Sequence, residues 1–234
     1  MNFTKYIIFL FFSISTSSAQ NFGSASYKIV LPQYKKSLNS EVNNLMEDAK
    51  TIAEKKTYIL NFNATQSHFF DKSSMESDSN KNDMISGIAS IMGGGSNYYD
   101  SEKGVSINEN IQGVLVKNVY PKKWVISTET KLIDNYTCYK AELIESYTSN
   151  GKERNKIIVA WFAPSMPYPY GPKGYNGLPG LIIELIDESA KMTYFLTSLE
   201  IKEEPIVIKF PTGKIWTREE YMKTISADMP FKKN

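Results

Sequence analysis

Cysteine and histidine are almost absent from this 234-residue sequence, which contains one of each. A structural zinc site needs four ligands that are mostly Cys and His, so the composition excludes such a site. A single Cys cannot form an internal disulfide bond. A chain of this length buries roughly 70–75% of its unfolded surface, and it can therefore fold without a metal or a crosslink. We accordingly expect no metal site and no bound cofactor.

An excess of charge of either sign is also missing. The chain has 27 Lys and Arg residues against 25 Asp and Glu residues, a formal net charge of +2. A protein dedicated to nucleic acids carries a clear basic excess, so we expect no nucleic-acid partner. With 41% hydrophobic and 22% charged residues, the chain has the composition of a globular protein, and no repeat or linker divides it.

Long hydrophobic runs are absent as well. The apolar stretch Tyr6–Ile14 is about nine residues long, whereas a transmembrane helix needs about 20. Lys5 precedes this stretch and small residues up to Ala19 follow it, a pattern typical of a secretory signal peptide. We predict a signal peptide over 1–19 and a single exported domain over 20–234. No Cys follows the apolar stretch, so we expect a periplasmic or cell-surface protein without a lipid anchor or a transmembrane segment.

The first part of the exported domain predicts one strand and one long helix. Residues 22–31 alternate as a strand does, and Pro32 ends the alternation. Helical periodicity then extends over 36–55, with apolar side chains at Leu38, Val42, Leu45, Ala49 and Ile52. We expect this helix to pack on a sheet, because its other face carries charges of both signs.

Strand patterns fill most of the remaining sequence at the spacing of hairpins. The predicted strands are 57–62, 67–70, 98–99, 111–119, 124–132, 136–144, 156–162, 181–186, 192–199 and 206–210. No helical pattern separates most of them, so neighbouring strands should be antiparallel. Residues 157–162 are apolar on both faces, which indicates a central strand covered on both sides. A capping-box spacing from Thr217 to Glu220 predicts a short C-terminal helix over 221–226.

Together these patterns predict a mainly β (α+β) fold. We expect a single curved antiparallel sheet, half-barrel or sandwich-like, with one long packed helix and a short C-terminal helix. Residues 71–97 interrupt the strands with Ser, Asp, Asn, Lys and Gly, which predicts an exposed, flexible loop with a helical turn at 84–91. Oxygen-bearing residues from Asp78 resemble the start of a calcium loop, but Ala89 stands where that loop needs Glu.

Candidate catalytic groups are sparse. His68 lies in a predicted strand, and no nucleophile-elbow motif accompanies it, so a structural role is favoured over a catalytic one. The adjacent acids Asp187 and Glu188 stand at a predicted turn and are interpreted as solvated charges. Cys138 is expected to be a buried, unreactive thiol. We therefore predict no catalytic residue.

The densest local signal is the stretch 161–184, which is rich in Pro, Gly and Tyr. Proline fixes φ and glycine permits positive φ, so this connection follows a specified path. It could form an aromatic binding surface, or it could be a structural crossover that covers the end of the sheet. As a binding surface it would use Trp161, Pro167, Tyr168, Tyr170, Gly171, Pro172, Tyr175, Gly177, Leu178, Pro179 and Gly180.

Within this stretch, Gly177–Ile182 reads Gly-Leu-Pro-Gly-Leu-Ile, the signature for which the GLPGLI family is named. The upstream block Tyr136–Ala141 and the tail from Pro211 to Tyr221 are also similar to that family. The sequence therefore resembles a GLPGLI protein over most of the exported domain, with the insert at 71–97 as a departure. The resemblance implies an exported protein of Bacteroidetes-type bacteria, and it implies no activity, cofactor or catalytic residue.

The function favoured at this point is a non-enzymatic binding or accessory protein of the cell envelope. The 15 Tyr and 12 Phe residues, together with the missing catalytic set, favour an apolar ligand in the concave sheet or an envelope protein bound at the 161–180 loop. Two alternatives stay open. One is a hydrolase that uses carboxylates scattered through the sequence, and the other is a structural envelope component.

Overall fold

A computed structural model describes residues 22–33, 39–72, 84–110, 113–118, 121–149 and 152–228. The predicted signal peptide and the calcium-like residues from Asp78 lie outside these ranges. The strands are β1 (Gly23–Val30), β2 (Tyr58–Phe62), β3 (Gln66–Asp71), β4 (Ser96–Asp100), β5 (Val105–Glu109), β6 (Leu115–Asn118), β7 (Val125–Ile133), β8 (Tyr136–Ser149), β9 (Lys152–Ala163), β10 (Leu181–Asp187), β11 (Met192–Ile201) and β12 (Ile215–Thr217). The helices are α1 (Ser40–Lys55), α3 (Met84–Met92), the short 3₁₀ helix η1 (Pro172–Gly174) and α4 (Arg218–Asp228).

All twelve described strands belong to one sheet, in the order β12-β6-β5-β4-β3-β2-β1-β11-β10-β9-β8-β7. Neighbouring strands are antiparallel, as predicted, except that β12 pairs with β6 in parallel. The mainly β fold with one open sheet and a C-terminal helix is thus confirmed. Within the described ranges, no helix is long and apolar enough to cross a membrane.

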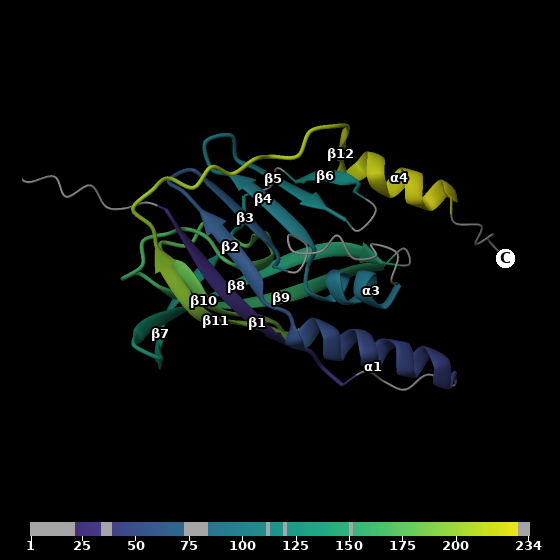
Figure 1. Cartoon of the computed structure of the whole chain (residues 1–234), viewed down its shortest axis with the longest axis horizontal. Helices are drawn as coiled ribbons and strands as arrows, with labels where there is room; N and C mark the ends of the chain where they lie inside the picture. The colour runs from purple at the N-terminus through teal and green to yellow at the C-terminus, as the bar shows by residue number, and fades with distance from the viewer. Residues whose placement is uncertain are drawn as a thin grey trace, which may run out of the picture.

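The long helix α1 begins at Ser40 because Asn39 caps it. The Asn39 side chain accepts hydrogen bonds from the backbone N–H groups of Glu41 and Val42, which the first helical turn leaves without partners. Only the last turns of α1 are buried, around Ala49 and Ala53, and Figure 1 shows the first turns extending beyond the sheet. The apolar stripe therefore packs on the protein over only part of its length.

The stretch 71–97, expected to be a loop, contains regular structure where the structure describes it. The predicted helical turn is the helix α3, which packs beside α1, and β4 begins at Ser96. The glycines before β4 are closely packed, since a Cβ atom at Gly93 would lie 2.2 Å from the Tyr58 ring. The small residues therefore permit close contact with the core at this point.

One strand prediction is wrong, and two strands were not predicted. Residues 206–210 form no strand, because the segment packs through its side chains; Ile208 joins a small cluster with Tyr98 and Ile107. The alternation of apolar and polar residues over 206–210 results from the burial of one face, and the segment does not pair with a strand. The strands β5 and β12 were missed, because both are short and β5 is mostly polar.

The 161–180 connection lies inside the curve of the sheet. The Tyr27 hydroxyl of β1 donates a hydrogen bond to the Ile182 carbonyl at 2.7 Å, and Tyr170 packs on Phe62 of β2. Strand β9 supports this connection and is buried on both faces from Ile158 to Ala163, as predicted. The sheet therefore curls around the long connection between its own strands β9 and β10.

Candidate functional site

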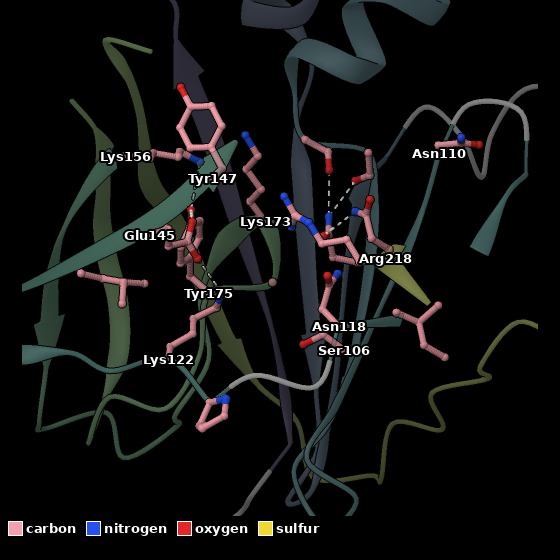
Figure 2. A pocket seen from close by; sticks show the side chains of 18 of the residues that line it. Ser106, Asn110, Asn118, Lys122, Glu145, Tyr147, Lys156, Lys173, Tyr175 and Arg218 are labelled. Atoms are coloured by element: carbon pink, nitrogen blue, oxygen red, sulfur yellow. Dashed lines mark hydrogen bonds and ion pairs between the residues drawn. The ribbon is translucent and has the colours of Figure 1, made fainter. Parts of the chain in front are cut away.

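A cavity of about 1010 Å³ opens between the two ends of the curled sheet. Residues of β4, β5, β6 and the start of α4 line one side, and residues of β8 and β9 line the other. In the sheet order these strands lie far apart, and they enclose one space because the sheet curves. Figure 2 shows Glu145, Lys156 and Tyr175 along one side, Ser106 and Asn118 along the other, with Lys173 between them. We call the side with Glu145 and Lys156 the β8–β9 wall, and the side with Ser106 and Asn118 the α4 wall.

Charged groups on the β8–β9 wall are connected to each other. Lys122 Nζ donates to Glu145 Oε1 at 3.3 Å, and the Tyr175 hydroxyl donates to Glu145 Oε2 at 3.0 Å. Lys156 Nζ donates to the Tyr175 hydroxyl oxygen at 3.1 Å and pairs with the buried Asp187 at 3.0 Å. Each of the two cations is thus paired with one carboxylate, and the Tyr175 hydroxyl connects the two pairs.

Tyr175 lies at the centre of this network, and its hydroxyl stays protonated, so that it can donate a hydrogen bond to Glu145. Burial, followed by the neighbouring charge of Glu145, raises the pKa of its hydroxyl far above the usual value for tyrosine. The Lys122 ammonium also lies 4.5 Å from the Tyr175 ring centroid, a favourable cation–π distance. The β8–β9 wall is therefore a fixed surface in which each charge has a partner.

Lys173 has different surroundings. It stands in η1 with φ +56° and ψ 28°, a left-handed conformation that is uncommon for a residue with a side chain. Its stem lies against Gly94, where an added Cβ atom would be 2.9 Å from Lys173 Cγ. Partial burial and the nearby charge of Lys156 lower the pKa of the Lys173 ammonium to about 8. No hydrogen bond or ion pair joins its ammonium to another described residue.

The α4 wall is rich in amides. Asn108 Nδ2 donates to Asn97 Oδ1 at 2.7 Å, and Asn97 Nδ2 donates to the Gly94 carbonyl at 2.8 Å. Asn110 Nδ2 donates to the Tyr221 hydroxyl at 2.9 Å, which joins α4 to the end of β5. These bonds hold the wall in place, and the Asn118 amide in the cavity lining remains for a polar ligand.

The charge around the cavity is uneven. Its lining includes five cations, Lys122, Lys123, Lys156, Lys173 and Arg218, and two carboxylates, Glu109 and Glu145. The β8–β9 wall pairs two of those cations internally. Among the described residues, Lys123, Lys173 and Arg218 have no ion-pair partner. The cavity therefore presents a local excess of positive charge in a chain that is nearly neutral overall.

The candidate binding residues of the 161–180 loop lie mainly away from this cavity. Tyr175 is the one candidate in its lining. Tyr175 is itself buried, and so are Trp161, Tyr170, Gly171, Pro172, Leu178 and Gly180. Tyr168 is half-buried, and Pro167, Gly177 and Pro179 are exposed.

Close packing explains the burial of the two glycines. A Cβ atom at Gly180 would lie 2.3 Å from the Ala163 carbonyl oxygen, and one at Gly171 would lie 2.5 Å from Ile182. The buried part of the loop therefore packs into the core, and the binding role that the sequence suggested for its residues stays a prediction.

Three other residues can be compared with expectation. Asp187 was interpreted as a solvated turn charge, and this was wrong, because it is 4% exposed and paired with Lys156. His68 is a satisfied strand residue, as expected: its ring stacks on Tyr98 and its Nε2 lies 2.9 Å from Ser96 Oγ.

Cys138 is buried, as expected, and its pKa is raised to about 11 by burial. Such a thiol carries little thiolate near neutral pH and is a poor nucleophile. The described residues contain no group of three or more His, Cys, Asp or Glu side chains that could hold a metal ion.

The sequence did not reveal the cations of the cavity. The sequence around Lys123, Lys156 and Arg218 is polar, as it is around many surface residues. The three side chains line the same cavity only because the sheet curves. One signal was present: Lys173 is the single charged residue in the Pro-, Gly- and Tyr-rich stretch 161–180. A charge within a rigid apolar loop is costly unless the fold places it in solvent or in a cavity.

Comparisons with known proteins are consistent with the family resemblance in part. Residues 149–184 match the Porph_ging family, described as "Protein of unknown function (Porph_ging)", which is related to the GLPGLI family. No curated protein matches the chain. Solved structures of PNGF-II in two crystal forms share the fold, with 11% identity and TM-scores of 0.52 and 0.51. They match 88% of this chain, which spans about a third of the length of PNGF-II (33% and 32%), and the likeness establishes similarity of fold alone.

Proposed function

We propose that this protein is an exported, GLPGLI-type binding protein that holds a small anionic ligand in the cavity between its two walls. The observation that carries the proposal is the set of three cations, Lys123, Lys173 and Arg218, for which the described residues supply no anionic partner. Cations that converge on a concave site attract and orient negatively charged groups. A carboxylate or phosphate group would replace the missing partner.

The polar lining favours this ligand over the apolar one expected from the sequence. Apolar side chains such as Ile107 and Leu143 line part of the cavity, but amides and charges line the rest. An apolar ligand would leave the Lys173 ammonium and the Asn118 amide without hydrogen-bond partners among the described residues, which is unfavourable. A ligand with both hydroxyl and carboxylate groups would satisfy them.

The arrangement also favours binding over carboxylate-based hydrolysis. In the cavity lining, Glu145 accepts hydrogen bonds from Lys122 and Tyr175, which hold it as an acceptor. A general acid needs a carboxyl group that keeps its proton, usually through an apolar environment or a second carboxylate. Among the described residues, the carboxyl groups whose pKa is shifted are those of Asp100 and Glu220. Both pKa values are lowered, and neither residue lines the cavity.

Isothermal titration calorimetry with three anions tests the proposal. Citrate, phosphate and sulfate are titrated at constant ionic strength, with sorbitol as a neutral control that still forms hydrogen bonds. We expect binding of at least one anion, and none of sorbitol. The Arg218→Gln variant should weaken that binding by about 5- to 10-fold, or roughly 1–1.4 kcal/mol.

The matched control is Lys202→Gln, which removes a cation from an exposed pair outside the cavity lining. Its anion affinity should equal that of the unchanged protein. If none of the three anions binds, or if both variants weaken binding equally, the cavity is no anion site and the proposal fails.

A further inference from the structure

Lys173 is the one cation of the cavity that is both partly buried and without a described ion-pair partner. Lys156, from the opposite side of the same space, pairs with Asp187. Lys123 and Arg218 are exposed and remain hydrated. Lys173 therefore combines three properties that the others lack together: a partly buried side chain without a described ion-pair partner, a fixed backbone and a place in the cavity lining.

The backbone of Lys173 is held firmly despite its strained conformation. Tyr175 N–H donates to the Pro172 carbonyl at 3.1 Å, and Ile182 N–H donates to the Tyr170 carbonyl at 3.0 Å, which closes the loop on both sides of η1. Gly171 also packs closely on Ile182, since an added Cβ atom at Gly171 would lie 2.5 Å from that side chain. A left-handed residue costs about 1–3 kcal/mol and persists where the surroundings fix it, often at functional sites.

Charged and polar groups around the Lys173 amine come from several elements. Lys156 of β9 opposes its protonation, while Asp187 of β10 and Glu145 of β8 favour it. Both carboxylates are already engaged, Asp187 by Lys156 and Glu145 by Lys122 and Tyr175. The hydroxyl of the buried Tyr194 in β11 lies near the Lys173 stem, and because its pKa is raised it adds no negative charge.

We propose that the Lys173 amine takes the carbonyl group of an aldehyde or 2-oxo acid ligand as a reversible imine. The neutral Nζ attacks the carbonyl carbon, so that a C–N bond forms and the C=O π electrons move to oxygen. A proton passes from nitrogen to that oxygen, giving a carbinolamine. Loss of water then gives the C=N bond, with both hydrogens of the water derived from the amine, and hydrolysis reverses the step.

A lysine performs this step only when a fraction of its amine is unprotonated. In known amine nucleophiles, desolvation or a neighbouring cation lowers the pKa and so raises that fraction. A pKa of about 8 leaves roughly one-tenth of the Lys173 amine neutral at pH 7, against well under one-hundredth for an ordinary lysine. Exposed Arg218 or Lys123 would meet the carboxylate of a 2-oxo acid. The imine extends the proposed function but needs only the cavity and the amine.

Reductive trapping tests the inference. The full chain is incubated at pH 7.5 with glyoxylate or with propanal, each with cyanoborohydride, and the modified lysines are located by peptide mass spectrometry. We expect Lys173 to be modified about tenfold or more faster than Lys123, because of its larger neutral fraction. Its labelling should reach half its maximal rate near pH 8, whereas that of exposed lysines should keep rising to higher pH.

Two variants complete the experiment. Lys173→Arg keeps the charge but cannot form the imine, and it should lose this label while circular dichroism shows an unchanged fold. Lys202→Arg, the matched control outside the cavity lining, should keep it. Labelling of Lys173 at or below the rate of Lys123 in the unchanged protein overturns the inference without need of any variant. Equal trapping of propanal and glyoxylate would support the amine and count against the anion site, so the two proposals fail separately.

Discussion

The two walls of the cavity use similar residues in opposite ways. On the β8–β9 wall, Lys156 and Lys122 are joined to Asp187 and Glu145 around a buried tyrosine. On the other side and in η1, the cations have no described carboxylate partner. Removing one member of a buried, paired set of charges strongly destabilises a folded chain, whereas charges without partners remain available to a ligand. The difference assigns stability to one wall and recognition to the other.

The largest effect on the free energy of unfolding should come from removing the Asp187 charge from the β8–β9 wall. Asp187→Asn leaves the partly buried Lys156 ammonium without its carboxylate, while the asparagine oxygen can still accept the Ala190 N–H bond. We expect a loss of about 2–3 kcal/mol in the free energy of unfolding, measured by urea denaturation. Asp134→Asn, at an exposed turn, is the control and should change it by less than about 0.5 kcal/mol. Equal effects would mean that the wall contributes no more than surface charge.

The second prediction concerns Lys173, which should make the free energy of unfolding depend on pH. Its pKa is about 8 in the folded protein and about 10.4 in the unfolded chain, so the unfolded chain binds more protons between these values. The free energy of unfolding should therefore rise with pH through this window, by at most about 3 kcal/mol. Tyrosines titrate in the same range, so the measurement is the difference between the unchanged protein and Lys173→Met at pH 7.5 and pH 10. A difference that does not change with pH would contradict a lowered pKa.

A smaller effect is expected from the tyrosine that joins the paired wall. Tyr175→Phe keeps the ring beneath Lys122 but removes the hydroxyl between Glu145 and Lys156. The expected loss is about 1–2 kcal/mol, since two hydrogen bonds to charged groups disappear and the partners can reach water at the cavity. Thermal and urea unfolding both measure it. Tyr147→Phe, at the exposed rim, should be near neutral, and a similar loss there would remove the special role of Tyr175.

The smallest effect on stability should come from the unpaired side. Arg218→Gln removes an exposed charge that no described carboxylate holds, so the free energy of unfolding should change by less than about 0.5 kcal/mol. Urea denaturation of the ligand-free protein measures this change. A loss above about 1 kcal/mol would mean that Arg218 stabilises the fold, and the contrast between the two walls would no longer hold.

Much of the fold could be predicted from local patterns. The apolar run over 157–162 identified the central strand β9. The Thr217 to Glu220 spacing identified the start of α4, where each of the two side chains accepts a hydrogen bond from the backbone N–H of the other residue. These signals depend on neighbours within a few residues. Residues 206–210 gave the same signal as a strand, because burial on one face produces alternation whether or not the backbone pairs.

The cavity could not be predicted in the same way. Asp187 resembles a turn residue until Lys156, 31 positions earlier in the chain, is placed beside it by the β9–β10 pairing. Arg218 approaches the same space from a helix that only the parallel β12–β6 pairing positions. A charge's role depends on its distant partners, and these are set by the register and the curl of the sheet.

The parallel pairing of β12 with β6 also concerns the order of synthesis. β12 and α4 follow every other described strand in the chain, and the segment after β11 must pass from the middle of the sheet to its far edge to reach them. In a chain made from its N-terminus, the part that carries Arg218 is therefore the last of the described elements to emerge. The cavity gains its α4 side only at that moment, so a nascent or C-terminally trimmed chain would have the paired wall without a complete site for a ligand.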